Sequence, residues 1–188
     1  MKEKLRIHDS FWFLISGIFL LDADRVFLAF LVASIVHELG HFLMVKQYGG
    51  TIIRFHLSAL GGLIQYWLPK ASRYSELWIA LSGPLAGLLL WQVAVHLHYP
   101  LLAGASLLLS IFNLFPAAPL DGGRALESCF IPGHWLPKTV RSISICVLLL
   151  AGVYSGISQR GWSLGLIAVC LLAQQYMALQ SPKIRSKI

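Results

Sequence analysis

The chain of 188 residues is 57% hydrophobic and only 12% charged, and its mean hydropathy is +0.71. This composition excludes an ordinary soluble globular domain and indicates an integral membrane protein. The formal net charge of +7 does not require a nucleic-acid partner, because basic residues on one membrane face are attracted to anionic headgroups.

Six apolar segments predict membrane-spanning helices, each of which needs about 20 mostly apolar residues. They lie near residues 8–22, 26–45, 76–98, 101–117, 140–157 and 162–179. The first is the shortest, and a signal peptide is the alternative for it. The lack of a small-residue cleavage site favours a retained span. The sequence therefore predicts an all-α polytopic membrane protein with about six transmembrane helices, forming a single domain over residues 1–188.

The distribution of basic residues predicts the orientation of these spans. Of the 15 Lys and Arg residues, all but Arg25 and Arg160 would lie on one face. Because cytoplasmic loops carry an excess of Lys and Arg, both termini are expected in the cytoplasm.

The connection between the second and third spans, residues 46–75, is apolar and contains β-branched and aromatic residues on both sides of Gly61 and Gly62. This pattern predicts a short membrane-associated β-hairpin. An irregular interfacial loop is the alternative, and the spacing alone does not decide between them.

The third span contains small residues that favour close helix packing. Gly83 and Gly87 lie four residues apart, and Pro84 removes one helix hydrogen bond. Generic packing and a role in shaping a site both explain this pattern.

The stretch HELGH, residues 37–41, places three ionisable groups inside the apolar second span. On a helix His37 and His41 project from one face, one turn apart, which suits two imidazoles binding one zinc ion. Glu38 is offset around the helix, so it can reach a metal-bound water as general base without being a ligand. Ionisable groups are costly in a bilayer, so these residues predict a functional site over a structural pair of histidines.

A catalytic zinc needs a third protein ligand and an open position. Asp121 is the candidate, because it follows the fourth apolar span, which ends on the same predicted face as His41. A helix cap or turn residue before Gly122 and Gly123 is the alternative.

The remaining potential ligands are interpreted as structural or surface residues. Three cysteines without metal-type spacing are expected to be buried thiols: Cys129, Cys146 and Cys170. Five histidines without a partner at ligand spacing are expected at the surface or interface: His8, His56, His96, His98 and His134.

Taken in order, HELGH at 37–41, LGG at 60–62, SGPLAG at 82–87 and FNLFPAAPLDGG at 112–123 resemble the motifs of the site-2 proteases, which are zinc enzymes that cut substrates within the membrane. The spacing and short N-terminal lead most resemble the sporulation branch of that family. Two departures are the Ala59 before LGG and the lack of an appended C-terminal nucleotide-sensing domain or a PDZ domain.

The resemblance implies that His37, His41 and Asp121 bind Zn²⁺, that Glu38 is catalytic, and that Asn113 and Pro119 bind substrate. It implies a multi-pass protein of the bacterial cell membrane that cleaves a membrane-tethered protein, such as a sigma-factor precursor during sporulation, under control of membrane regulatory proteins. The alternatives are a catalytically silent membrane binding protein that retains the fold, and a metal or proton transporter.

Overall fold

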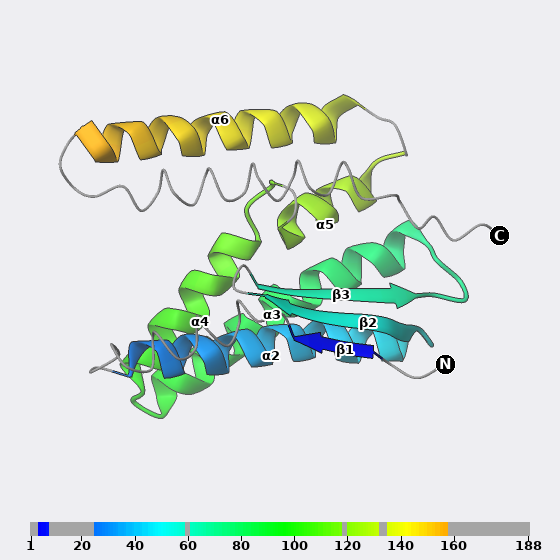
Figure 1. Cartoon of the computed structure of the whole chain (residues 1–188), viewed down its shortest axis with the longest axis horizontal. Helices are drawn as coiled ribbons and strands as arrows, with labels where there is room; N and C mark the ends of the chain where they lie inside the picture. The colour runs from blue at the N-terminus through cyan, green and yellow to red at the C-terminus, as the bar shows by residue number, and fades with distance from the viewer. Residues whose placement is uncertain (1–3, 8–24, 59–60, 118–119, 132–134, 158–188) are drawn as a thin grey trace. The chain divides into compact units, whose positions relative to one another are not determined.

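The computed structural model describes residues 4–7, 25–58, 61–117, 120–131 and 135–157. The predicted spans near 8–22 and 162–179 lie outside these residues. The chain divides into two compact units, Met1–Phe112 and Asn113–Ile188, and each is described by itself (Figure 1).

The first unit is built on helices α2 (Val26–Gln47) and α3 (Arg73–His96), which pack along each other. Both are long and apolar enough to cross a membrane by length and composition. A shorter apolar helix, α4 (Pro100–Asn113), follows α3. On α2, large apolar side chains such as Leu28, Ile35 and Leu43 are exposed, as expected of a helix surface that faces lipid tails.

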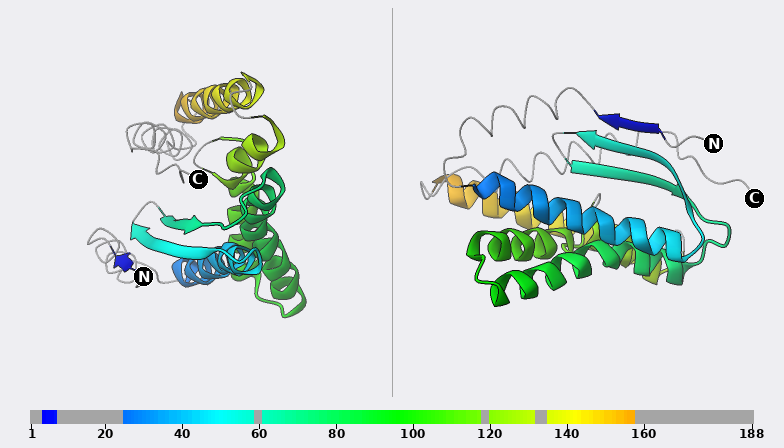
Figure 2. Two further views of the ribbon diagram at one scale, coloured as in Figure 1. Left: turned by 90° about the vertical axis from the view of Figure 1, so that its right-hand side faces the viewer. Right: turned by 90° about the horizontal axis from the view of Figure 1, so that it is seen from below.

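A three-stranded sheet accompanies these helices (Figures 1 and 2). Strands β2 (Thr51–Ser58) and β3 (Gly61–Trp67) form the predicted hairpin, antiparallel, with Thr51 opposite Trp67 and Ser58 opposite Gly61. Strand β1 (Lys4–Ile7) pairs parallel with β2 on its other side. The hairpin is thus one part of a larger sheet, and β1 was not predicted.

The sheet is joined to the helices by a buried cluster formed by Val45, Ile52, Leu68 and Ile79. These residues come from α2, from β2, from the connection after β3 and from α3. The cluster therefore fixes the start of α3 against the end of α2, which is the relationship that positions the histidines described below.

Two local signals define α3. Ser72 caps its N-terminus, since its hydroxyl accepts a hydrogen bond from the Ser75 amide while the Ser75 hydroxyl bonds the Ser72 amide in return. Pro84 lies inside the helix and is fully buried. The helix continues through Pro84, so the residue removes one hydrogen bond without ending it.

The second unit contains helices α5 (Asp121–Cys129) and α6 (Trp135–Ile157), which contact each other. The sequence did not predict α5, because Gly122 and Gly123 favour a turn. The close approach of Gly122 to the Leu114 and Phe115 carbonyls, where a Cβ would overlap backbone, explains the first of these glycines.

Three expectations need correction. Cys129 and Cys146 are exposed, not buried, because the sequence around a cysteine does not show which face of its helix the thiol occupies. Helix α4 ends at Asn113, four residues before the predicted end, since Pro116 disfavours helical backbone at the residue before it. Helix α6 begins earlier than expected, at Trp135.

Candidate metal centre

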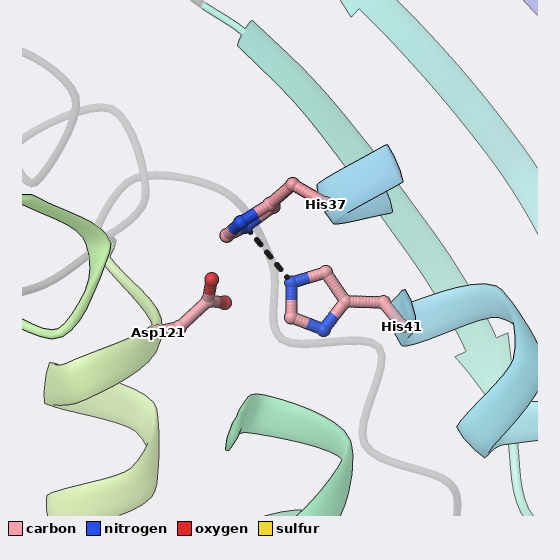
Figure 3. A group of neighbouring side chains, drawn as sticks. All are labelled: His37, His41 and Asp121. Carbon is pink, nitrogen blue, oxygen red and sulfur yellow. Dashed lines mark hydrogen bonds between the residues drawn. The ribbon is translucent and has the colours of Figure 1, made fainter. Parts of the chain in front are cut away.

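Two imidazoles face each other on the buried side of α2. His37 and His41 are only 4% and 6% exposed. Their Nε2 atoms lie 3.3 Å apart, and the rings are edge to face with centroids 5.0 Å apart (Figure 3). The predicted placement of both rings on one helix face is confirmed.

This separation fits a shared zinc ion. For Zn–N bonds of about 2.0–2.1 Å and a tetrahedral angle of about 109°, two nitrogen ligands lie roughly 3.3–3.4 Å apart. The two Nε2 atoms are already at that distance. The pair therefore needs little rearrangement to bind one metal ion.

The orientation of His41 is fixed by the backbone of α3. Its Nδ1 atom lies 2.7 Å from the carbonyl oxygen of Ile79, and a carbonyl can only accept, so Nδ1 carries the proton and donates. The lone pair is consequently on Nε2, on the side of His37. A hydrogen bond of this kind sets the tautomer and ring orientation of metal-binding histidines.

Ser82 supports the same carbonyl. Its hydroxyl donates to the Ile79 oxygen at 2.7 Å and lies 3.4 Å from His41 Nδ1. Ile79 has no functional signature in the sequence, because every residue type carries a backbone carbonyl.

Glycines leave room for the two rings. A Cβ at Gly83 would overlap His41 Nε2 and lie 2.8 Å from His37 Nε2. A Cβ at Gly40 would overlap the Ser82 carbonyl and lie 2.8 Å from the Ala86 Cβ. Gly40 therefore allows α2 to approach α3 closely, and Gly83 keeps the space beside both Nε2 atoms open. The SGPLAG stretch thus shapes the site as well as the packing.

Asp121 is the first residue of α5 and is 7% exposed. Its Oδ1 atom lies 3.7 Å from the guanidinium of Arg124, which is a loose ion pair at the limit of direct contact. A buried carboxylate is rare unless it is paired or coordinates a metal.

The ligand atoms of His37, His41 and Asp121 all lie within 4.8 Å of one another (Figure 3). This is the one group of three metal-type ligands found among the described residues. Two imidazole nitrogens and one carboxylate oxygen form a donor set that zinc accepts. Three protein ligands leave the fourth position open, as in catalytic zinc sites.

Three further site residues were predicted from the sequence: Glu38, Asn113 and Pro119. Glu38 follows His37 on α2 and is half-buried, and Asn113 is the last residue of α4 and is also half-buried. Pro119 lies outside the described residues. The roles assigned to these three residues remain predictions. His96 and His98 are both exposed, as expected.

The chain is similar in sequence to curated zinc metalloproteases. No protein-family model matches the chain. The chain is 36% identical over 115 residues to a zinc metalloprotease of Methanocaldococcus jannaschii, a match that covers 55% of this chain and 33% of that protein. It is 27% identical over 165 residues to stage IV sporulation protein FB of Bacillus subtilis, covering 80% of this chain and 57% of that protein. The aligned regions therefore span about a third and rather more than half of these relatives.

The solved structure of the site-2 protease from Methanocaldococcus jannaschii has the same fold, with a TM-score of 0.72 at 23% identity, covering 100% of this chain and 95% of that one. Apolar helices and a buried group of two histidines and an aspartate define a membrane protein with a metal centre. The chain is thus similar in sequence to curated zinc metalloproteases and shares the fold of a site-2 protease.

Proposed function

We propose that the chain is an intramembrane zinc endopeptidase that cleaves a membrane-tethered protein. The observation that carries this proposal is the pair of Nε2 atoms at 3.3 Å, with the His41 tautomer set by the Ile79 carbonyl. A histidine pair with a purely structural role would not need the lone pair of His41 Nε2 to face the space that Gly83 leaves open.

The depth of the pair supports cleavage within the bilayer. Lys46 marks the basic end of α2, and a helix rises about 1.5 Å per residue. His41 and His37 are thus about 8 and 14 Å from that end along the helix axis. Both distances fall inside a hydrocarbon core about 30 Å thick.

His37, His41 and Asp121 would hold the zinc ion, which would supply Lewis acidity to polarise the scissile carbonyl and to lower the pKa of a water molecule. Glu38 takes a proton from the attacking water as its oxygen bonds to the carbonyl carbon. Glu38 then delivers that proton to the amide nitrogen as the carbon–nitrogen bond breaks. The products are a carboxylic acid and an amine, which become a carboxylate and an ammonium group when the acid's proton passes to the amine.

Substrate is held in extended form, because helical hydrogen bonds shield the amide that is cut. Asn113 can donate from its amide to the substrate backbone, and Pro119 is assigned a role in substrate binding. Strand β3 is an edge of the sheet, since β2 lies between β1 and β3, and an extended segment can add to it by main-chain hydrogen bonds.

The membrane arrangement we propose has six spans in one domain and both termini in the cytoplasm. The distribution of Lys and Arg supports it, with Lys46, Lys70 and Arg73 at one end of the α2–α3 pair and Arg25 at the other end of α2.

The similarity to stage IV sporulation protein FB supports a proposal for the substrate. We propose a membrane-tethered precursor, such as that of a sigma factor, and control by membrane regulatory proteins.

Reconstitution in proteoliposomes with a panel of tethered precursors tests the function. Wild type should yield a shortened product, and Glu38→Gln should abolish it while zinc content is unchanged. Glu127→Gln, which removes the same charge from an exposed position on α5, should cleave like wild type. Equal cleavage by Glu38→Gln would exclude the assigned base. Zinc binding without cleavage of any precursor would favour a silent binding protein.

A further inference from the structure

We propose that the end of α2 and the start of α3 form a binding surface for anionic phospholipid headgroups. The surface consists of Lys46, Trp67, Lys70, Arg73 and Tyr74, and we call it the basic rim. All five side chains are exposed, with Trp67 at 47% and Tyr74 at 65%. The proposal does not depend on peptidase activity.

The basic rim is assembled from two segments that lie against each other. The amide of Gly49 donates to the Lys46 carbonyl at 2.9 Å, and a Cβ at Gly49 would lie 3.8 Å from Pro69. Lys70 follows Pro69 directly, and Arg73 begins α3. The turn after α2 therefore contacts the loop that carries the other basic residues.

A buried hydrophobic cluster holds the basic rim in place. Val45 and Leu68 belong to one core cluster. Val45 directly precedes Lys46, and Leu68 lies two residues before Lys70. The position of the rim is thus fixed by packing, so its charges are held together in the folded protein.

The charge of this segment is uniformly positive. No Asp or Glu occurs between Glu38 and Glu76. Glu76 is half-buried and accepts a hydrogen bond of 2.6 Å from the Tyr66 hydroxyl, so it is turned toward β3. Lys46 lies over the Phe42 ring with its Nζ atom 5.6 Å from the centroid, a cation–π contact that orients the ammonium group.

The aromatic residues distinguish a lipid from a soluble anion. Trp and Tyr are enriched at the headgroup level of membranes, where one side of the ring is apolar and the other wet. Leu39 and Leu43, one to two turns before Lys46, are exposed and would contact acyl chains. Exposed leucines along α2 next to basic residues at its end match a phospholipid, whose acyl chains are apolar and whose headgroup is anionic.

The test uses the full chain purified in a neutral detergent, with a short-chain fluorescent phosphatidylglycerol as probe and the matching phosphatidylcholine as neutral reference. Fluorescence anisotropy should show tighter binding of the anionic lipid, weakening as salt is raised. The triple variant Lys46→Gln, Lys70→Gln and Arg73→Gln should bind the anionic probe roughly 10- to 100-fold more weakly.

Controls separate the outcomes. Arg25→Gln removes one charge from the opposite end of α2 and should leave binding unchanged, whereas Lys70→Gln alone should weaken it several-fold. The charge-reversed variant Lys46→Glu, Lys70→Glu and Arg73→Glu should prefer a cationic probe lipid, which shows that the surface is still folded. Equal binding of both neutral and anionic lipids, no change in the triple variants, or full competition by inorganic phosphate would overturn the proposal.

Discussion

The Nδ1 atom of His41 donates a hydrogen bond of 2.7 Å to the backbone carbonyl of Ile79. This bond joins α2 to α3 and sets which nitrogen of His41 is available to a metal. Because the acceptor belongs to the backbone, no side-chain change at Ile79 removes it directly. The packing of α3 on α2 is therefore part of the metal centre.

Gly83→Ala should abolish zinc binding. The added Cβ would overlap His41 Nε2 and lie 2.8 Å from His37 Nε2, although Ala is favoured over Gly within a helix by about 1 kcal/mol. Zinc content after purification is the measurement. Gly104→Ala is the matched control, because a Cβ there has no atom within 4 Å. Full zinc content in Gly83→Ala would contradict the geometry.

Gly87→Ala should destabilise the packing of α3 on α4. The new Cβ would overlap the Ser110 hydroxyl, which donates to the Ser106 carbonyl at 2.7 Å. This overlap overpacks the contact between the two helices, at a cost of about 1–3 kcal/mol. Thermal unfolding in detergent should show a lower midpoint, and adding Ser110→Ala should restore most of the loss. A double variant no better than the single one would rule out this contact as the cause.

Tyr66→Phe should loosen the sheet from α3 without removing zinc. The Tyr66 hydroxyl donates to the Glu76 carboxylate at 2.6 Å, and a hydrogen bond to a charged group contributes about 1.5–3 kcal/mol, less where water reaches it. Limited proteolysis should cut the hairpin faster in this variant. Tyr74→Phe, at an exposed position, should be cut at the wild-type rate. Equal rates for all three proteins would show that the bond does not hold the sheet.

Gly122→Ala should lower zinc affinity by disturbing the start of α5. A Cβ there would overlap the Leu114 carbonyl and lie 2.7 Å from the Phe115 oxygen, and backbone atoms cannot move aside as a side chain can. Asp121 would then be displaced with the first turn of the helix. Competition with a zinc chelator should show weaker retention than in Ser128→Ala, which removes only a hydroxyl bonded within α5.

The sequence was informative where chemistry depends on side chains at a fixed spacing. The four-residue interval between His37 and His41 predicted two rings on one face, and the structure confirms it. The apolar stretches predicted α2 and α3. The hairpin was predicted with its turn at Gly61 and Gly62, but both glycines lie within β3, opposite Ser58 and Leu57.

The sequence was less informative where structure depends on distant backbone. Strand β1 is four residues long and is stabilised by pairing with β2, so its own residues carry little signal. The role of Ile79 comes from a carbonyl, which every residue has. Helix α5 begins with two glycines after Asp121, which reads locally as a turn, and the close approach of Leu114 that requires Gly122 arises only in the folded unit.

Zinc K-edge X-ray absorption of the purified protein tests the central claim most directly, because it reports the type and distance of the metal's ligands. We expect two imidazole nitrogens at about 2.0–2.1 Å with oxygen ligands completing the shell, and a loss of one oxygen or of the metal in Asp121→Ala. A shell containing sulfur, or a wild-type spectrum unchanged in both His37→Ala and Asp121→Ala, would contradict it.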